Sequence, residues 1–473
     1  MKPAALTTLL LVATALSGCV GQQRYRFITN QPECFDSGGD PFPAGSREGR
    51  WPSLDCGDSF FKAGFIEFDE SGHALDEDQL TKVLKLIESE KQRTPGGKVI
   101  TLLYVHGWKN NAAQVNPGAK AKDVEKFKAA LWELGYRSHQ TSPDKPVPVV
   151  GVYVGWRGKS LMGPGWFTFM SYWPRRNTAN RVGGGPDLAS SINRVIDTTN
   201  GTTSADASRV LLVGHSFGAR VLEHAIETDR IPLYTQALRR GTPVNPRVDL
   251  ALYVNAANDS RLSVKRVGVF EQAGLEVRHP DYDPARCAKE PALVECRDYP
   301  LLVAITSRGD LATKTLQPIA NTLSQDGGVV DPTVAPCQLQ AGGQCEYLDA
   351  TPGVKGIRRT APAHSVFMQS HLVDEIICRP STRLDCPASD RRCFSFRIEG
   401  ESASCYRGTS RTRVGNDRRP FNETAYWIMD VDPRIVKDHG DIWNQNFVSM
   451  LGALMAPRGF FDPDAGRMTL RVR

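Results

Sequence analysis

A strand-like apolar run that leads directly into a glycine-flanked serine constrains this chain more than any other feature. Residues 210–213 are Val-Leu-Leu-Val, and residues 214–218 read Gly-His-Ser-Phe-Gly. A sharp turn from strand to helix holds its central residue, here Ser216, in a cramped conformation, so the positions two before and two after it must be small. Gly214 and Gly218 meet this requirement, and apolar residues then recur with helical spacing. The pattern predicts a strand, a tight turn that presents a serine hydroxyl, and a helix whose N-terminus faces the hydroxyl.

Apolar runs and amphipathic segments alternate along most of the chain. Strands are expected at 64–68, 99–105, 149–154, 210–213, 250–254, 301–305 and 426–429. Helical periodicity is seen at 80–87, 124–134, 188–196, after Ser216 and at 442–454. This alternation predicts an α/β fold with a doubly wound, mostly parallel sheet that carries helices on both faces. In such sheets the ligand lies at the carboxyl ends of the strands.

The two ends of the chain and one internal span differ from this pattern. The N-terminal residues join a single lysine to an apolar run, as in a secretory signal peptide, and a segment rich in Gly, Pro and Ser follows, as in a flexible tether. We expect a signal peptide at 1–18, a tether at 19–58, the α/β domain at 59–324 and 421–458, a Cys-rich insertion or cap at 325–420, and a tail at 459–473.

The end of the signal segment, Leu16-Ser17-Gly18-Cys19, resembles the bacterial lipobox. The resemblance implies cleavage before Cys19 and attachment of a lipid to its thiol. Because no acidic residue follows Cys19, it favours an outer-membrane lipoprotein that faces the periplasm. No other stretch approaches the ~20 apolar residues that cross a bilayer. We therefore expect a soluble body that is tethered in the bacterial cell envelope.

The cysteine content fits an oxidising compartment. Of eleven cysteines, ten remain when Cys19 is set aside, an even number that favours disulfides. The sequence has no C-x-x-C pair, which argues against zinc ribbons and thioredoxin-like chemistry. The sequence does not fix the connectivity, but we expect short-range pairs such as Cys287 with Cys296. The formal charge of +6 is weak for a chain of this length, and no basic run is interleaved with aromatic residues, so nucleic acid is not an expected partner.

A serine hydroxyl becomes a good nucleophile only when a base removes its proton and an acid orients that base. Asp310, just after the strand at 301–305, is the expected acid, and Asp259 is the alternative. His439, between the last predicted strand and the closing helix, is the expected base, and His364 is the alternative.

The remaining site residues are expected near the same edge of the sheet. The backbone N–H of Phe217 and that of Trp108, in the loop after the strand at 99–105, are the expected donors to the oxyanion. The aromatic residues Trp166, Phe167 and Tyr172 are candidates for lining a substrate pocket.

These features together resemble the α/β-hydrolase superfamily. The shared elements are a strand leading into His106-Gly107-Trp108, the G-x-S-x-G turn at Ser216, and the chain order Ser216, Asp310, His439. The turn at 156–158 and the segment at 439–443 are similar to poorly characterised bacterial envelope hydrolases of that superfamily. The resemblance covers about 60–454 apart from the Cys-rich span. It implies a Ser-His-Asp triad, an acyl-enzyme intermediate and no cofactor. No metal is expected, because no further cluster of ligands accompanies Asp438, His439 and Asp441 in the sequence.

The sequence thus favours a serine hydrolase that cleaves a carboxylic ester, either a small molecule or a lipid, with the N-terminal lipid as its contact with the membrane. Two alternatives stay open. The same residues could transfer the acyl group to an alcohol if water is excluded, or the fold could serve a non-catalytic binding lipoprotein, because a fold does not fix a function. The substrate, the acyl chain length and the oligomeric state do not follow from the sequence.

Overall fold

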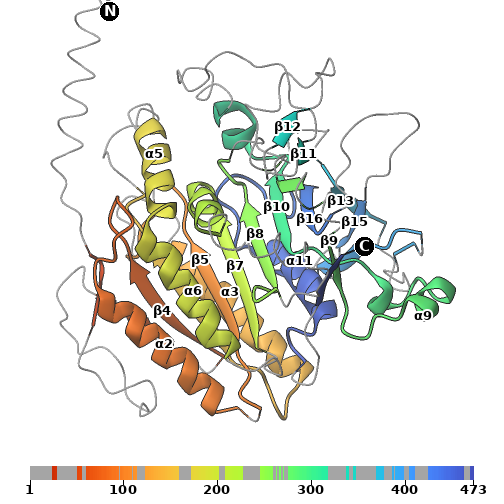
Figure 1. The fold of residues 1–473 in the computed structure, drawn as a ribbon, viewed down its shortest axis with the longest axis horizontal. Coiled ribbons are helices and arrows are strands. Elements are labelled where there is room, and N and C mark those ends of the chain that lie inside the picture. Colours follow the sequence, from red (N-terminus) through yellow and green to blue (C-terminus); the bar gives the residue numbers. More distant parts are fainter. Residues whose placement is uncertain are drawn as a thin grey trace, which may run out of the picture.

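The computed structural model describes most of the predicted α/β domain (Figure 1). The described residues are 24–28, 51–55, 60–94, 96–108, 110–113, 123–158, 172–201, 208–226, 246–258, 263, 266–267, 270, 275–317, 337–339, 345–347, 369–377, 386–387, 389–398, 404–410, 424–462 and 469–472. Within these ranges, no helix has both the length and the apolar character needed to cross a bilayer.

The core of the molecule is one eleven-stranded sheet. In spatial order its strands are β14 (Phe394–Ile398), β15 (Ser404–Ser410), β13 (His371–Ile376), β16 (Tyr426–Val431), β10 (Leu302–Ser307), β8 (Leu250–Val254), β7 (Arg209–His215), β5 (Ile100–Val105), β6 (Val149–Gly155), β4 (Phe61–Glu67) and β3 (Leu54–Asp55). All neighbours from β13 to β4 pair in parallel, and the pairings at the two edges, β14 with β15, β15 with β13 and β4 with β3, are antiparallel. The predicted α/β fold with a mostly parallel sheet is confirmed.

Helices cover both faces of this sheet (Figure 1). One face carries α2 (Glu77–Gln92), α5 (Tyr172–Gly183), α6 (Pro186–Asn200) and the helix at 217–226, and the other carries α3 (Asp123–Thr141) and α11 (Gln445–Met455). Alternate residues of β5 enter the two cores: Leu103 packs on the first face, and Leu102 and Tyr104 pack on the second. Burial on both faces explains why the central strands are apolar throughout rather than alternating.

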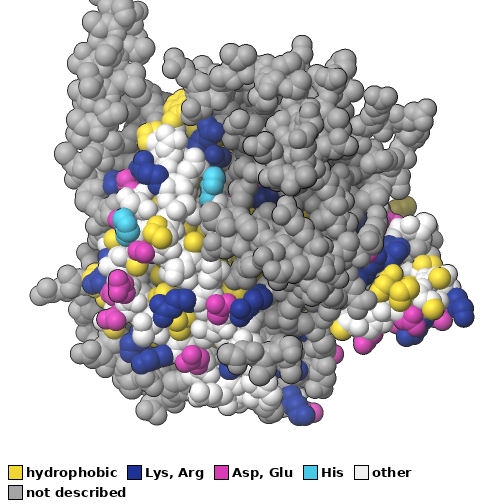
Figure 2. All heavy atoms as spheres, viewed as in Figure 1, with side chains coloured by type: hydrophobic (Ala, Val, Ile, Leu, Met, Phe, Trp, Pro, Cys, Tyr) yellow, Lys and Arg dark blue, Asp and Glu magenta, His cyan; other side chains and the backbone are white. Residues whose placement is uncertain are grey.

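The outer surface of the helices is polar. Over α2 and α6, basic and acidic side chains are interspersed (Figure 2). Asp76 caps α2 by accepting a hydrogen bond from the backbone N–H of Asp78 (3.1 Å). Pro186 stands at the first position of α6, where the backbone N–H of any residue would have no partner inside the helix, so the missing N–H of proline costs nothing there. Helices α2 and α6 therefore bury one apolar face and keep a solvated one.

Part of the Cys-rich span belongs to the main sheet. Its described strands β13, β14 and β15 extend the sheet beyond β16, and β11 (Cys337–Leu339) pairs with β12 (Cys345–Tyr347) in a separate hairpin. A disulfide joins Cys386 to Cys393 just before β14, and Cys405 in β15 is also disulfide-bonded. The sequence did not predict these strands, because edge strands with one face less buried lack the continuous apolar runs of the centre.

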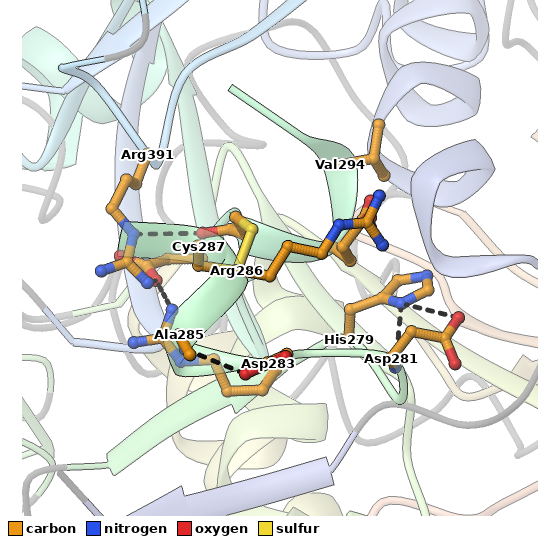
Figure 3. The surroundings of a disulfide bond; sticks show 12 residues. His279, Asp281, Asp283, Ala285, Arg286, Cys287, Val294 and Arg391 are labelled. Atoms are coloured by element: carbon orange, nitrogen blue, oxygen red, sulfur yellow. Dashed lines mark hydrogen bonds and ion pairs between the residues drawn. A yellow bond between two sulfur atoms is a disulfide. The ribbon is translucent and has the colours of Figure 1, made fainter. Parts of the chain in front are cut away.

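A second disulfide, Cys287–Cys296, closes a short loop before β10 (Figure 3). It joins helix α9 (Pro284–Lys289), which Asp283 caps through a bond from the N–H of Ala285 (2.9 Å), to a 3-10 turn. Arg391 donates to the carbonyl of Cys296 (3.1 Å), so this loop is tied to the Cys-rich span. The short-range pair expected from the sequence is present in the structure.

Two segments near the ends pack where the sequence predicted a tether and a tail. In the tether range, β1 (Arg26–Phe27) pairs with β2 (Trp51–Pro52), and Arg26 is 2% exposed with its guanidinium 3.6 Å from the centre of the Phe65 ring. The carboxylate of Glu67 accepts the backbone N–H of Arg26 (2.7 Å). In the tail range, β17 (Thr469–Val472) pairs with β9 (Leu275–Arg278). Composition did not predict this packing, because a few specific contacts rather than a periodic pattern hold the segments.

Candidate active site

The backbone around Ser216 is the sharp turn that the sequence predicts. Among the described residues other than glycine, only Ser216 and Asn255 have positive φ angles, of 56° and 45°. A Cβ atom on Gly218 would lie 2.1 Å from the carbonyl oxygen of Val105, and one on Gly214 would lie 2.5 Å from the Cα of Ala219. Gly218 is therefore needed so that the helix at 217–226 can start against β5 and the following loop, and Gly214 is needed so that this helix can lie close to its own strand β7.

Four neighbouring parallel strands bring polar residues to one edge of the sheet. In spatial order β7, β8, β10 and β16 are adjacent, and Ser216, Asn255, Asp310 and His439 follow them respectively. Because the strands are parallel, all four residues lie at the carboxyl edge.

His439 lies between Ser216 and Asp310. Its Nε2 is 2.7 Å from Ser216 Oγ, and its Nδ1 is 2.9 Å from Asp310 Oδ2. A carboxylate can only accept a hydrogen bond, so the ring proton is assigned to Nδ1, and Nε2 of the neutral ring accepts from the serine hydroxyl. The side chain of His439 is 29% exposed, whereas Ser216 and Asp310 are buried. The imidazole of His439 thus connects the nearly inaccessible hydroxyl of Ser216 to the inaccessible carboxylate of Asp310.

The Asp310 carboxylate is fully buried and accepts four hydrogen bonds. Oδ1 accepts from the backbone N–H groups of Ala312 (2.9 Å) and Thr313 (3.2 Å), and Oδ2 accepts from Thr313 Oγ1 (2.6 Å) as well as from His439. Burial raises the pKa of Asp310, but the positive charge that His439 carries when protonated, together with these hydrogen bonds, outweighs burial, so the pKa lies below its ordinary value. Asp310 is therefore an anion at neutral pH, and it both caps a short helical turn and orients the imidazole.

Two further side chains hold the backbone of His439. Its carbonyl oxygen accepts from Nε2 of His215 (2.7 Å) and from Nδ2 of Asn255 (3.2 Å), and the same amide donates to the carbonyl of Asp438 (3.2 Å). The Oδ1 atom of Asn255 accepts from the backbone N–H of Ser307 (3.1 Å). The loop that carries His439 is thereby fastened to the ends of β7, β8 and β10.

Sequence reasoning missed the contributions of His215 and Asn255. His215 lies inside the turn, one residue before Ser216, and its side chain reaches the His439 carbonyl. For Asn255 a signal existed: an asparagine directly after an apolar strand is one of the few residues that tolerates positive φ. Burial, followed by the charge of His439, lowers the pKa of His215 to about 3. The ring stays neutral and donates through Nε2.

The loop after β5 packs against the serine. A Cβ atom on Gly107 would lie 2.8 Å from His215 Nδ1 and 2.9 Å from Ser216 Cβ, so this position must be glycine. His106 fixes the loop to the end of β6, because its Nε2 accepts from the backbone N–H of Trp156 (3.0 Å) and its carbonyl accepts from the Trp156 indole (2.8 Å).

The aromatic residues Trp108, Phe217 and Tyr172 form one group beside the serine. The ring centre of Phe217 is 6.1 Å from that of Trp108 and 5.2 Å from that of Tyr172. The backbone N–H groups of Trp108 and Phe217 are the predicted oxyanion donors, and the side chains of these two residues contact each other. Tyr172, the first residue of α5, packs against both rings. Of the predicted pocket residues, only Tyr172 is described.

Several predicted site residues fall outside the described part of the chain. These are the alternatives His364 and Asp259, the aromatic residues Trp166 and Phe167, and the lipidation site Cys19. Within the described ranges, no group of three or more His, Cys, Asp or Glu side chains is arranged to hold a metal ion.

Comparison with known proteins gives only distant similarity. No protein-family model matches the sequence, and no curated protein matches it. Phospholipase PlaB from Legionella pneumophila is 10% identical, with a TM-score of 0.23 over 67% of this chain and 51% of that chain. An uncharacterized protein from Pseudomonas aeruginosa is 10% identical, with a TM-score of 0.18 over 52% of this chain and 42% of that chain. The chain spans about half the length of the phospholipase. At these TM-scores neither likeness carries an argument, and the function must be argued from the site itself.

Proposed function

We propose that this protein is a serine hydrolase that cleaves a carboxylic ester through an acyl-enzyme intermediate. The proposal rests on one observation: the His439 ring is within hydrogen-bonding distance of both Ser216 Oγ and Asp310 Oδ2. A serine held in a strained turn, a neutral base that accepts its proton and a buried anion that orients the base are the parts that nucleophilic acyl transfer requires.

In the proposed first step, Ser216 Oγ attacks the ester carbonyl while its proton moves to Nε2 of His439. The imidazolium that forms is stabilised by the Asp310 carboxylate, which stays ionised. Negative charge develops on the carbonyl oxygen, and the backbone N–H groups of Phe217 and Trp108 are the proposed donors to it. The tetrahedral intermediate collapses when the C–O bond to the alcohol breaks and His439 gives its proton to the leaving oxygen.

In the second step a water molecule takes the place of the alcohol. His439 Nε2 removes a proton from the water, the hydroxide adds to the acyl carbon, and the bond to Ser216 breaks as His439 returns the proton to Oγ. The imidazole must keep one position through both steps, and the bonds from His215 and Asn255 to its carbonyl support this requirement.

We also propose that the protein acts as a lipoprotein of the bacterial envelope, anchored through Cys19. The support is the sequence alone, since Cys19 lies outside the described residues. Metabolic labelling with a fatty-acid analogue tests the proposal: the wild-type chain should carry the label and Cys19→Ser should not. Label on the Cys19→Ser variant, or none on wild type, would refute the anchor.

Labelling with a fluorophosphonate probe tests the proposed chemistry directly. The probe should react with the wild-type protein and not with Ser216→Ala, and ester turnover should fall by about 10⁴-fold or more. Ser142→Ala, which removes an equivalent hydroxyl after α3, is the matched control and should keep labelling and turnover. Folded wild-type protein that neither reacts with the probe nor cleaves any ester would instead favour a binding lipoprotein. Transfer of the acyl group to an added alcohol, in preference to water, would favour an acyltransferase.

A further inference from the structure

Two arginines at the same edge of the sheet as the serine share a single carboxylate. Glu70 follows β4 and Arg157 follows β6, so both lie at the carboxyl edge of the sheet, because these strands are parallel neighbours. Arg175 reaches them from the first turn of α5. Arg157 Nη1 (3.1 Å) and Arg175 Nη1 (2.7 Å) both contact the same oxygen, Glu70 Oε1. Two positive charges therefore face one negative charge.

Both guanidinium groups keep a buried donor without an acceptor. Within the described residues, Arg157 Nη2 and Arg175 Nε are closed to solvent and have no hydrogen-bond partner. Arg175 as a whole is only 5% exposed, and its Nη1 also donates to the Arg157 carbonyl (2.9 Å). A buried charged donor without an acceptor costs stability, so its presence calls for a reason. An anion supplied by a ligand would provide both the missing acceptors and the missing charge.

Neighbours of these arginines in the chain contact the segments around the serine. A Cβ atom on Gly158, the residue after Arg157, would lie 2.9 Å from the carbonyl oxygen of Gly107, which itself packs against Ser216. On α5, Arg175 stands three residues after Tyr172, a spacing that places both on one side of a helix, and the Tyr172 ring packs on Phe217.

We propose that Arg157 and Arg175 form a binding site for a phosphate group of the substrate, so that the ester cleaved is part of a phosphate-bearing lipid. The inference rests on the proposed function and names its substrate class. A tetrahedral phosphate presents oxygens in several directions and can accept from two separate guanidinium groups at once. Glu70 holds the two arginines in place when no ligand is bound. Its negative charge also reduces the repulsion between the two guanidinium groups.

The first experiment compares two esters that have the same acyl groups, one with a phosphate-bearing headgroup and one without. Short-chain dihexanoyl phosphatidylglycerol and neutral dihexanoylglycerol are assayed below their aggregation limits, and the ratio of their kcat/KM values is followed. Arg157→Gln and Arg175→Gln should lower this ratio about tenfold to a hundredfold, as expected when one charge-assisted hydrogen bond is lost. Glu70→Gln, which removes the competing anion, should raise the ratio. Arg93→Gln, an equal charge change at the distant end of α2, should leave it unchanged.

The second experiment does not depend on turnover. Inorganic phosphate should raise the melting temperature of the wild type and of Glu70→Gln, and should do so much less in the two arginine variants. Arg157, whose side chain is 18% exposed, provides the variant less prone to misfold if Arg175→Gln does not fold. The proposal is overturned if phosphate stabilises all variants equally, if it stabilises none, or if acetate acts as strongly as phosphate. If Ser216→Ala leaves ester cleavage intact while phosphate binding responds as described, the proposed function fails and the phosphate site stands.

Discussion

Replacing Asp310 by asparagine separates its two structural tasks. Oδ1 accepts two backbone N–H groups, from Ala312 and Thr313, while Oδ2 faces His439 Nδ1 and Thr313 Oγ1. In Asp310→Asn the amide oxygen must keep the two backbone donors, so the NH₂ group turns toward His439. An NH₂ group donates, and the imidazole can accept only through an Nδ1 without a proton. The ring is then held with its proton on Nε2, where it can no longer accept from Ser216.

The expected loss of kcat is about 10⁴-fold, the size that the wrong tautomer causes in a Ser-His-Asp triad. That loss corresponds to about 5.4 kcal/mol of transition-state stabilisation. The free energy of unfolding should change little, because the cap of the short turn is kept. Asp310→Ala removes the cap as well, and the free energy of unfolding should fall by about 0.5–2 kcal/mol.

The assay is steady-state turnover of a chromogenic ester, with urea unfolding of both variants in parallel. Thr313→Val is the control: it removes one donor to Oδ2 but leaves the carboxylate, so turnover should fall only about tenfold, the cost of one hydrogen bond of about 1.4 kcal/mol. If Asp310→Asn keeps turnover within tenfold of wild type, Asp310 is a helix cap only, and the reasoning about the tautomer is wrong.

Two further predictions concern the turn and the buried histidines. Gly218→Ala should abolish activity and folding, because its Cβ would lie 2.1 Å from the Val105 carbonyl oxygen. The control is Gly440→Ala, next to His439, whose Cβ would meet only an atom at 3.9 Å and which should keep activity and folding. Equal activity of the two variants would contradict this prediction. Burial lowers the pKa of His106 to about 4 and that of His215 to about 3. Below pH 6.5 these two histidines therefore bind protons in the unfolded chain but stay neutral in the folded protein. Stability should fall by up to about 1.4 kcal/mol per pH unit for each ring between pH 6.5 and about 4, and unfolding curves that do not change over this range would contradict the prediction.

Local patterns predicted the parts of the fold that local physics controls. The apolar runs of β5, β6 and β7 mark strands buried on both faces, and the glycines around Ser216 mark a turn that no larger residue could make. The strands β13, β14 and β15 were missed, because β13 and β14 have short alternating patterns of burial instead of the continuous apolar runs of the central strands.

The site was predicted only as far as chain position can predict it. Ser216, Asp310 and His439 were chosen because each follows a central strand, and the structure brings them within hydrogen-bonding distance; their catalytic roles stay a proposal. The asparagine after β8 indicated a special backbone conformation at Asn255. No residue pattern indicated the bonds from His215 and Asn255 to the His439 carbonyl, because a backbone acceptor carries no residue signature.

What the sequence alone determined is where the chain must turn and which faces it must bury, since glycine sterics and hydrophobic period act over a few residues. What only the tertiary structure decided is which distant groups meet. His439 lies 223 positions after Ser216, and the two touch because β7, β8, β10 and β16 are neighbours with their carboxyl ends at one edge. The order of strands in a sheet is set by packing of the whole domain, and no local segment of the chain encodes it.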